Sequence, residues 1–207
     1  MKLHWSPTSP FVRKVLIVLH ETGLIDSVEF VRTPVAMDKP NLGLQPDNPL
    51  LKLPTLVLDD GYALYDSRVI CEYLATKAGS EIFPSDPDLR IKALRQQALG
   101  DGLMDVLLLY RQELLKPAER STQAWIDSFA IKVEGTLAKL DEIYGGQGAD
   151  TAFDIGAITN GCALSYLDFR FAELDWRAAH PALAAWHKDV FMSRASVLAT
   201  QPAVQVS

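Results

Sequence analysis

Hydrophobic positions in the first third of the chain switch between the spacing of a strand and the spacing of a helix. Residues 1–5 can form a short strand, and the Ser- and Pro-rich residues 6–10 interrupt the pattern. Apolar side chains then recur at helical spacing over residues 12–19. Residues 28–31 favour a second strand, and the Pro- and Asn-rich residues 34–49 favour a loop. The pattern predicts a β-α-β unit.

A hairpin and a further helix follow. Two apolar runs, 55–58 and 63–65, are joined by Asp59-Asp60-Gly61, and Asp-Gly between such runs is a strong turn signal. A helical pattern then begins at Ser67 and ends near Gly79. Pro84 and Pro87 mark the next stretch as a linker.

The rest of the chain has helical patterns only. Helices are predicted at roughly 89–115, 122–144, 153–171 and 181–192. Thr151 to Asp154 has the form of a capping box. This predicts that the Thr151 side chain accepts a hydrogen bond from a backbone N–H and that the Asp154 side chain reaches back to the backbone N–H of Thr151. The expected fold class is α/β plus all-α. A mixed β-α-β-β-β-α domain spans 1–79, a linker 80–88 and an all-helical domain 89–207.

Composition narrows the range of partners. Hydrophobic residues make up 48% of the 207, enough for a packed core, and the net charge is −6. That charge disfavours nucleic acid and anionic membranes, and the longest early apolar run, Val15 to Leu19, is too short to span a bilayer. Cys71 and Cys162 are far apart and suggest neither a disulfide framework nor a metal site. We expect a cytoplasmic protein without a metal.

Two predicted helix starts carry candidate chemistry. Ser9 precedes Pro10 as an N-cap would, so its hydroxyl and the free N–H groups beyond it can stabilise an anion. Asp66 and Ser67 occupy a similar position at the next helix. Each motif also fits a plain helix cap, and Thr8 and Ser6 are competing hydroxyls at the first one.

These motifs, in this order, resemble the glutathione transferase family over essentially the whole chain. Three patterns carry the resemblance: Thr8-Ser9-Pro10-Phe11-Val12-Arg13-Lys14, then Asn48-Pro49 followed by Lys52-Leu53-Pro54-Thr55, and finally Asp66-Ser67. The first pattern is most similar to the bacterial and omega-like branches, in which Ser or Cys precedes Pro-Phe. The resemblance implies a thioredoxin-like first domain, a helical second domain and a cis bond before Pro54.

The resemblance also implies roles for individual residues. Ser9 would be the catalytic residue that holds the glutathione thiolate. Glutathione would contact Ser9, Lys39, Lys52, Leu53, Pro54, Asp66 and Ser67, with Arg13 a weaker candidate. The pocket for the second substrate would be lined by Met104, Leu107, Tyr110 and Arg111, although Met and aromatic residues at helical spacing are also typical of a core.

The function implied by the resemblance is glutathione transfer to a small hydrophobic electrophile or peroxide, in detoxification, by a cytoplasmic homodimer. Glutathione would be a substrate, and no metal, nucleic acid or membrane is expected. One alternative is a glutathione-dependent disulfide or dehydroascorbate-type reductase. Another is a binding or regulatory protein that keeps the fold without turnover.

Overall fold

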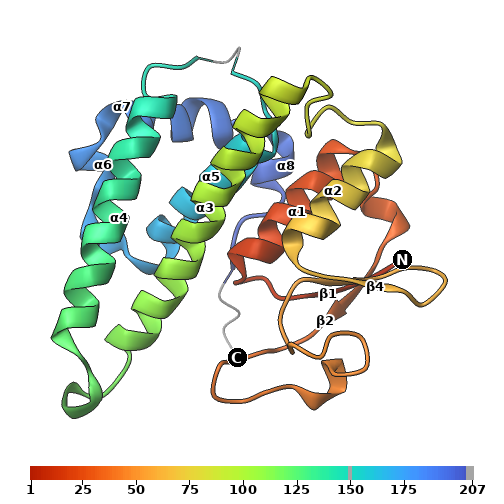
Figure 1. Ribbon diagram of the computed structural model, residues 1–207, viewed down its shortest axis with the longest axis horizontal. Helices are drawn as coiled ribbons and strands as arrows, with labels where there is room; N and C mark the ends of the chain where they lie inside the picture. Colours follow the sequence, from red (N-terminus) through yellow and green to blue (C-terminus); the bar gives the residue numbers. More distant parts are fainter. Residues whose placement is uncertain (149–150, 204–207) are drawn as a thin grey trace. The chain divides into compact units, whose positions relative to one another are not determined.

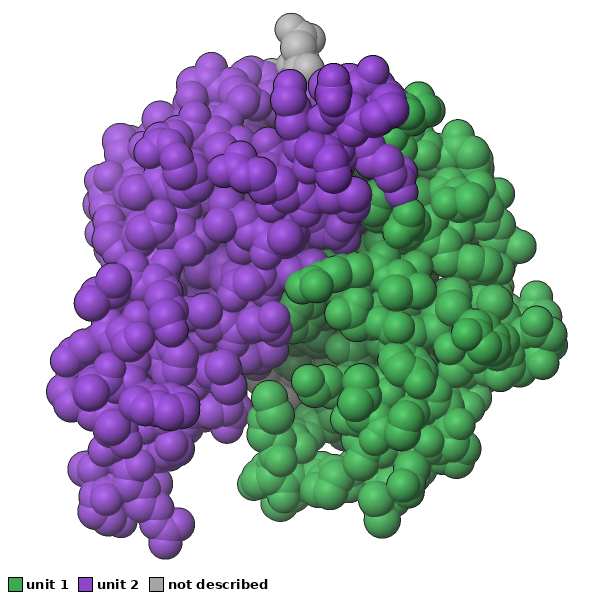
Figure 2. Space-filling view, in the orientation of Figure 1, with its two compact units in different colours: residues 1–85, 195–207 green, residues 86–194 purple. Residues whose placement is uncertain are grey.

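The computed structural model describes residues 1–148 and 151–203, which form two units. The first contains residues 1–85 and the C-terminal segment from Ala195, and the second contains Asp86–Arg194 (Figure 2). The sequence instead divides the chain at 80–88 and gives everything beyond to the second domain. The difference arises because the last short helix, α8 (Ala195–Leu198), packs on the first unit.

The first unit is built on a mixed four-stranded sheet of order β2-β1-β3-β4. Its strands are β1 (Lys2–Trp5), β2 (Glu29–Arg32), β3 (Thr55–Val57) and β4 (Ala63–Leu64). β1 pairs with β2 in parallel and with β3 antiparallel, and β3 pairs with β4 antiparallel. The strand and helix order confirms the predicted β-α-β-β-β-α domain.

Two helices lie side by side on the sheet, as Figure 1 shows: α1 (Pro10–Glu21) and α2 (Ser67–Ala78). α1 buries Val12, Val15 and Leu19 completely, as the helical spacing predicts. α2 ends at Gly79, whose φ of 63° is the left-handed conformation that favours glycine at a helix C-terminus. Short 3-10 turns lie at Ile25–Ser27 and Leu42–Leu44.

The C-terminal segment is held to α1 by polar contacts. The Arg13 guanidinium donates to the Val197 carbonyl at 3.3 Å, and the Ser196 hydroxyl donates to the Glu21 carboxylate at 2.5 Å. Val197 is fully buried. These contacts make α8 part of the first unit's core.

In the second unit, the described residues form helices joined by turns and irregular segments, without a strand. Its α-helices are α3 (Pro87–Leu114), α4 (Gln123–Tyr144), α5 (Ile155–Arg170), α6 (Trp176–Ala179) and α7 (Pro181–Trp186). A π-helical turn, His187–Phe191, continues α7, and 3-10 turns lie at Ala118–Arg120 and Ala172–Leu174. The four predicted long helices are present, whereas α6 and α8 were not predicted.

α5 is the central helix of this unit, because every residue from Ile155 to Leu167 is buried. It packs closely on α3, where a side chain on Gly100 would meet Asn160 Oδ1 at 2.7 Å. The predicted cap of α5 is wrong. Asp154 is itself the N-cap and accepts from the Ala157 N–H at 2.9 Å, whereas the Thr151 hydroxyl donates to the Gly148 carbonyl. Both residue types can cap, and the helix begins where burial begins, at Ile155.

Candidate functional site

Three of the sequence motifs meet at one edge of the sheet in the first unit. His4 pairs with Thr55, and Leu56 pairs with Leu64. The carboxyl end of β1, the amino end of β3 and the carboxyl end of β4 therefore lie at the same edge. The chain segments that continue from these strand ends are those of Ser9, Leu53-Pro54 and Asp66-Ser67, so the sheet topology brings the predicted site residues together.

Ser9 caps α1 in the way the sequence predicts. Its backbone is extended, at φ −82° and ψ 121°, and its Oγ accepts from the Val12 N–H at 3.3 Å. Because that bond uses a lone pair, the hydroxyl proton of Ser9 remains available to another acceptor. Pro10 has no N–H, and the Phe11 N–H has no hydrogen-bond partner among the described residues. The tip of α1 thus offers an O–H and an N–H to an anion.

The competing hydroxyls at this tip are engaged with each other. Ser6 Oγ and Thr8 Oγ1 lie 3.2 Å apart, and the Thr8 N–H approaches Ser6 Oγ at 3.5 Å. Both side chains are partly exposed. Because Ser6 and Thr8 bond to each other, they have less hydrogen-bonding capacity left for a ligand than Ser9 has.

The peptide bond between Leu53 and Pro54 is cis, which confirms the prediction. Pro54 is buried, and Leu53 lies two residues before Thr55, the first paired residue of β3. Within the described part of the chain, neither the N–H nor the C=O of Leu53 has a hydrogen-bond partner. An extended peptide could pair with this exposed backbone as an added strand.

A buried amide holds this segment in place, and the sequence analysis did not identify its role. Asn48 is 1% exposed and donates to the Lys52 carbonyl at 3.1 Å and to Thr55 Oγ1 at 2.9 Å. Its own carbonyl oxygen accepts from the Leu50 N–H at 2.9 Å, and Thr55 Oγ1 donates to the Lys52 carbonyl at 3.0 Å. The Asn48-Pro49 pair was the available signal, but its contacts depend on the turn that follows.

Asp66 is the N-cap of α2, and its Oδ1 accepts from the Arg68 N–H at 2.9 Å. Its carboxylate is exposed, so the second oxygen can meet a cation. Ser67 is 3% exposed, and its hydroxyl makes no hydrogen bond among the residues described. A negative group followed by a free hydroxyl at a helix N-terminus suits a zwitterion, with the ammonium at Asp66 and the carboxylate at Ser67.

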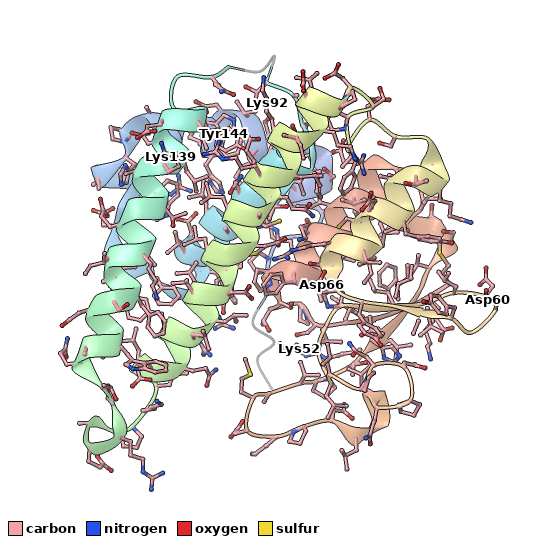
Figure 3. All side chains as sticks on the ribbon, in the orientation of Figure 1. Lys52, Asp60, Asp66, Lys92, Lys139 and Tyr144 are labelled. Atoms are coloured by element: carbon pink, nitrogen blue, oxygen red, sulfur yellow. The ribbon has the colours of Figure 1, made fainter. Side chains whose placement is uncertain are left out.

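Two candidate lysines lie in the connection between β2 and β3. Lys39 and Lys52 are exposed, and neither forms an ion pair among the described residues. Figure 3 labels Lys52 and Asp66 in the first unit. Arg13, the weaker candidate, is 5% exposed and bonds to the Val197 carbonyl. The lysines can therefore reach a ligand carboxylate more readily than Arg13.

The same connection is tied to β1 by a carboxylate. Asp47 Oδ2 lies 3.0 Å from Lys2 Nζ and 2.8 Å from His4 Nε2. The hydrogen bond from Lys2, followed by that from His4, holds the pKa of Asp47 below its ordinary value despite partial burial. His4 Nδ1 also lies 2.8 Å from Thr33 Oγ1. Both ends of the loop are thus anchored to the central strand.

The residues predicted for the second substrate lie on α3 in the helical unit. Met104 and Leu107 have no exposed surface, and the Tyr110 ring packs between Phe129 and Phe171 at centroid distances of 5.7 and 5.4 Å. Arg111 is partly exposed. The pocket assignment stays a prediction, and of its four residues Arg111 is the one best able to contact a ligand.

The sequence gives no metal site, and the residues that the structure describes contain no group of three or more His, Cys, Asp or Glu side chains able to hold one. Cys71 and Cys162 are buried and are not disulfide-bonded. Among the described helices, none has the length and apolar character needed to span a bilayer.

The first unit thus combines a thioredoxin-like mixed sheet with a cis-proline and two helix N-termini, and the second unit is built of helices. Comparison with known proteins agrees. Residues 3–81 match the family model described as "Glutathione S-transferase, N-terminal domain", and residues 123–189 match "Glutathione S-transferase, C-terminal domain". The chain belongs to the glutathione S-transferase family.

Individual relatives extend along the whole chain. An uncharacterized GST-like protein, YibF of Escherichia coli K12, is 33% identical over 206 residues, which is 98% of each chain. A glutathione transferase family member from Pseudomonas fluorescens Pf-5, crystallised with bound glutathione, is 42% identical with a TM-score of 0.92, over 98% of this chain and 99% of that one. A second structure from that organism, with S-(propanoic acid)-glutathione, is 40% identical with a TM-score of 0.88 over the same shares.

Proposed function

We propose that this chain is a glutathione transferase that ionises the glutathione thiol at the tip of α1 and directs the thiolate at a small electrophile. The observation that carries the proposal is the meeting, at one sheet edge, of a free Ser9 hydroxyl proton, the unpaired Leu53 backbone and the Asp66-Ser67 helix start. Each suits a different part of the tripeptide.

The energetics of thiolate formation are within reach of these groups. A thiol of ordinary cysteine-like acidity has a pKa of about 8.5, so ionising it at neutral pH needs a drop of roughly two units, about 2.7 kcal/mol. A hydrogen bond to a charged group supplies about 1.5–3 kcal/mol. The N-terminus of a helix adds about 0.3–1 kcal/mol. The Ser9 hydroxyl, with the Phe11 N–H and the α1 dipole, is therefore sufficient without a metal.

The remaining groups fix the peptide. The cysteinyl backbone of glutathione pairs with the N–H and C=O of Leu53 beside Pro54, as an added strand. The γ-glutamyl carboxylate binds the Ser67 hydroxyl and the α2 N-terminus, and its ammonium pairs with Asp66. The glycyl carboxylate pairs with Lys39 or Lys52, both of which are exposed. The glutathione-bound Pseudomonas relative supports a glutathione site in this chain, and the relative with a substituted glutathione supports a product of sulfur attack.

Transfer is favoured over disulfide exchange because position 9 is Ser, which cannot form a mixed disulfide. The family resemblance further leads us to propose a homodimer that acts in the cytoplasm in detoxification, with the second substrate near Met104, Leu107, Tyr110 and Arg111.

Ser9→Ala tests the proposed thiolate site. We expect near-normal glutathione binding and a loss of roughly 10²-fold in turnover, the scale of one lost donor to an anion. Calorimetry with glutathione and a conjugation assay with iodoacetamide measure the two quantities, and Thr8→Val is the matched control. Since Ala also removes a helix cap, a melting curve checks that the variant is folded. Unchanged turnover would assign the sulfur to Thr8, Ser6 or a backbone N–H.

Asp66→Asn tests the clamp separately from the fold. Asn caps helices about as well as Asp, so stability should stay nearly constant, whereas loss of the charge should weaken glutathione about tenfold or more. Asp86 is the matched control, because its Oδ1 caps α3 by accepting from the Asp88 and Leu89 N–H groups. Asp86→Asn should leave glutathione affinity unaltered. Equal affinities in all three proteins would reject the ammonium contact.

A further inference from the structure

Two buried side chains of the first unit hold the carbonyl of Lys52. This carbonyl accepts a hydrogen bond from Asn48 Nδ2 at 3.1 Å and another from Thr55 Oγ1 at 3.0 Å. Asn48 is 1% exposed and Thr55 has no exposed surface, so the carbonyl points toward the protein interior. The peptide bond between Lys52 and Leu53 is trans, and the C=O and N–H of a trans peptide point in opposite directions. The Leu53 N–H therefore points away from the interior, where a ligand can accept it.

Thr55 is the member of this network that is fixed to the sheet. It begins β3 and pairs with His4 on the central strand β1. Its Oγ1 accepts from Asn48 Nδ2 at 2.9 Å, which leaves the hydroxyl proton for the Lys52 carbonyl. The Thr55 hydroxyl thus connects the peptide plane that carries the Leu53 N–H to a paired strand.

The turn before this peptide plane is held by hydrogen bonds and not by the preference of its own backbone. Leu51 has a φ of 54°, a left-handed conformation that a leucine adopts only at a cost. Its N–H donates to the Asn48 carbonyl at 3.0 Å. Because contacts impose this conformation, the loss of one contact should allow the plane between Lys52 and Leu53 to rotate.

We propose that Thr55 is a positioning residue for glutathione: its hydroxyl, through the Lys52 carbonyl, aims the Leu53 N–H at the cysteinyl carbonyl of the bound peptide. The inference rests on the proposed glutathione site. Since Thr55 has no exposed surface, it acts through the backbone and not by touching the ligand. Its effect should therefore be confined to one hydrogen bond of the added strand.

Two ligands isolate that hydrogen bond. γ-Glutamylcysteinamide keeps the cysteinyl carbonyl, whereas γ-glutamylcysteamine lacks it. Both carry the thiol and the γ-glutamyl group, and neither has a glycyl carboxylate. Calorimetry on the wild-type protein should show the cysteinamide binding about fivefold tighter, the scale of one hydrogen bond between neutral groups. Thr55→Val keeps the shape of the side chain without the hydroxyl, and it should bind the two ligands with nearly equal affinity.

Two further variants control for the substitution itself. Thr55→Ser retains the hydroxyl and should keep the preference for the cysteinamide. Thr22→Val is the matched control, because the Thr22 hydroxyl donates to the Val18 carbonyl at 2.7 Å, at the opposite end of α1 from Ser9. It should also keep the preference. Melting curves check that the variants are folded, and Thr55→Ala serves if Thr55→Val does not fold.

Steady-state kinetics separate positioning from catalysis. With iodoacetamide as the electrophile, Thr55→Val should raise the KM for glutathione about fivefold, the scale of the same hydrogen bond. Its kcat at saturating glutathione should stay near the wild-type value, because the tip of α1 is unchanged. Ser9→Ala should show the reverse, with a lower kcat and a nearly unchanged affinity for glutathione.

The two proposals fail in different ways. A folded Thr55→Val protein that keeps the full preference for the cysteinamide overturns the positioning role and leaves the transferase proposal standing. An equal loss of affinity for both ligands also overturns it, because the hydroxyl would then support the site as a whole. A wild-type protein that binds glutathione but shows no preference overturns the contact with the Leu53 N–H. Absence of glutathione binding to the wild type overturns both proposals.

Discussion

Gly161 on α5 lies so close to Phe191 that the effect of a larger side chain on stability can be predicted. Gly161 lies in the buried part of α5, and a Cβ added there would fall 2.1 Å from Phe191 Cδ2 and 2.3 Å from Cε2. The Phe191 ring is fully buried and is bounded by Phe153, Trp186 and His187 at centroid distances of 6.1, 6.4 and 5.3 Å. The ring therefore has little room to move away.

Two effects oppose each other in Gly161→Ala. Alanine is favoured over glycine in a helix by about 1 kcal/mol. Forcing an extra carbon into a packed core costs about 1–3 kcal/mol. Gly135→Ala isolates the first effect, because Gly135 is an exposed residue of α4 with nothing within 4 Å of the added carbon. The difference between the two alanine variants should therefore equal the overpacking cost.

Urea denaturation followed by circular dichroism measures this difference. Gly135→Ala should be as stable as the wild type or slightly more stable. Gly161→Ala should unfold at lower urea, with a free energy of unfolding about 1–3 kcal/mol below that of Gly135→Ala. A smaller side chain at the neighbouring site, in Gly161→Ala/Phe191→Leu, should restore part of the loss relative to Phe191→Leu alone. Equal stabilities for the two single variants would refute the steric argument.

Two further predictions concern the loop between β2 and β3. Because the pKa of Asp47 is held below 3.8 by Lys2 and then His4, its ionised form stabilises the fold above that pH, and the contribution is lost as pH falls through the lowered pKa. Asp47→Asn should therefore lower the free energy of unfolding by about 0.5–1 kcal/mol at pH 7 and by progressively less in acid. Thermal unfolding of both proteins from pH 7 to pH 3 measures this difference. A difference that stays constant with pH would exclude the ionic contribution. Asn48→Ala should lower the free energy of unfolding by about 1–3 kcal/mol, because it leaves the buried Lys52 carbonyl and Thr55 hydroxyl with fewer hydrogen-bond partners. In the folded variant, glutathione should bind more weakly than to the wild type. Wild-type affinity by calorimetry would show that this amide does not support the Leu53-Pro54 backbone as a binding site.

The structural features that could be predicted best from the sequence are those that depend on a few neighbouring residues. The Ser9 cap and the Asp-Gly turn depend on side chains within one turn of each other, so their local chemistry predicts them. The start of α5 was misplaced because Thr151 and Asp154 are both competent caps, and tertiary burial decides between them. The four-residue helices α6 and α8 are too short to show a period.

Contacts between distant segments could not be predicted in the same way. Tyr110 on α3 packs its ring 5.4 Å from that of Phe171 at the end of α5, and only the packing of the two helices brings these rings together. Asn48 similarly reads as part of a loop until the turn to Thr55 closes around it. The helix starts of the candidate site could thus be predicted from the sequence. The contacts between segments that are distant in the sequence could be seen only in the fold.

The position of α8 has a consequence for biosynthesis. The first unit is interrupted by the whole helical unit and resumes only at Ala195, with Val197 in its interior. During translation, residues 1–85 therefore emerge long before the last piece of their own core. A fragment cut after Ser85 would lack that piece, so any attempt to produce the glutathione-binding half alone should graft the α8 segment back onto it.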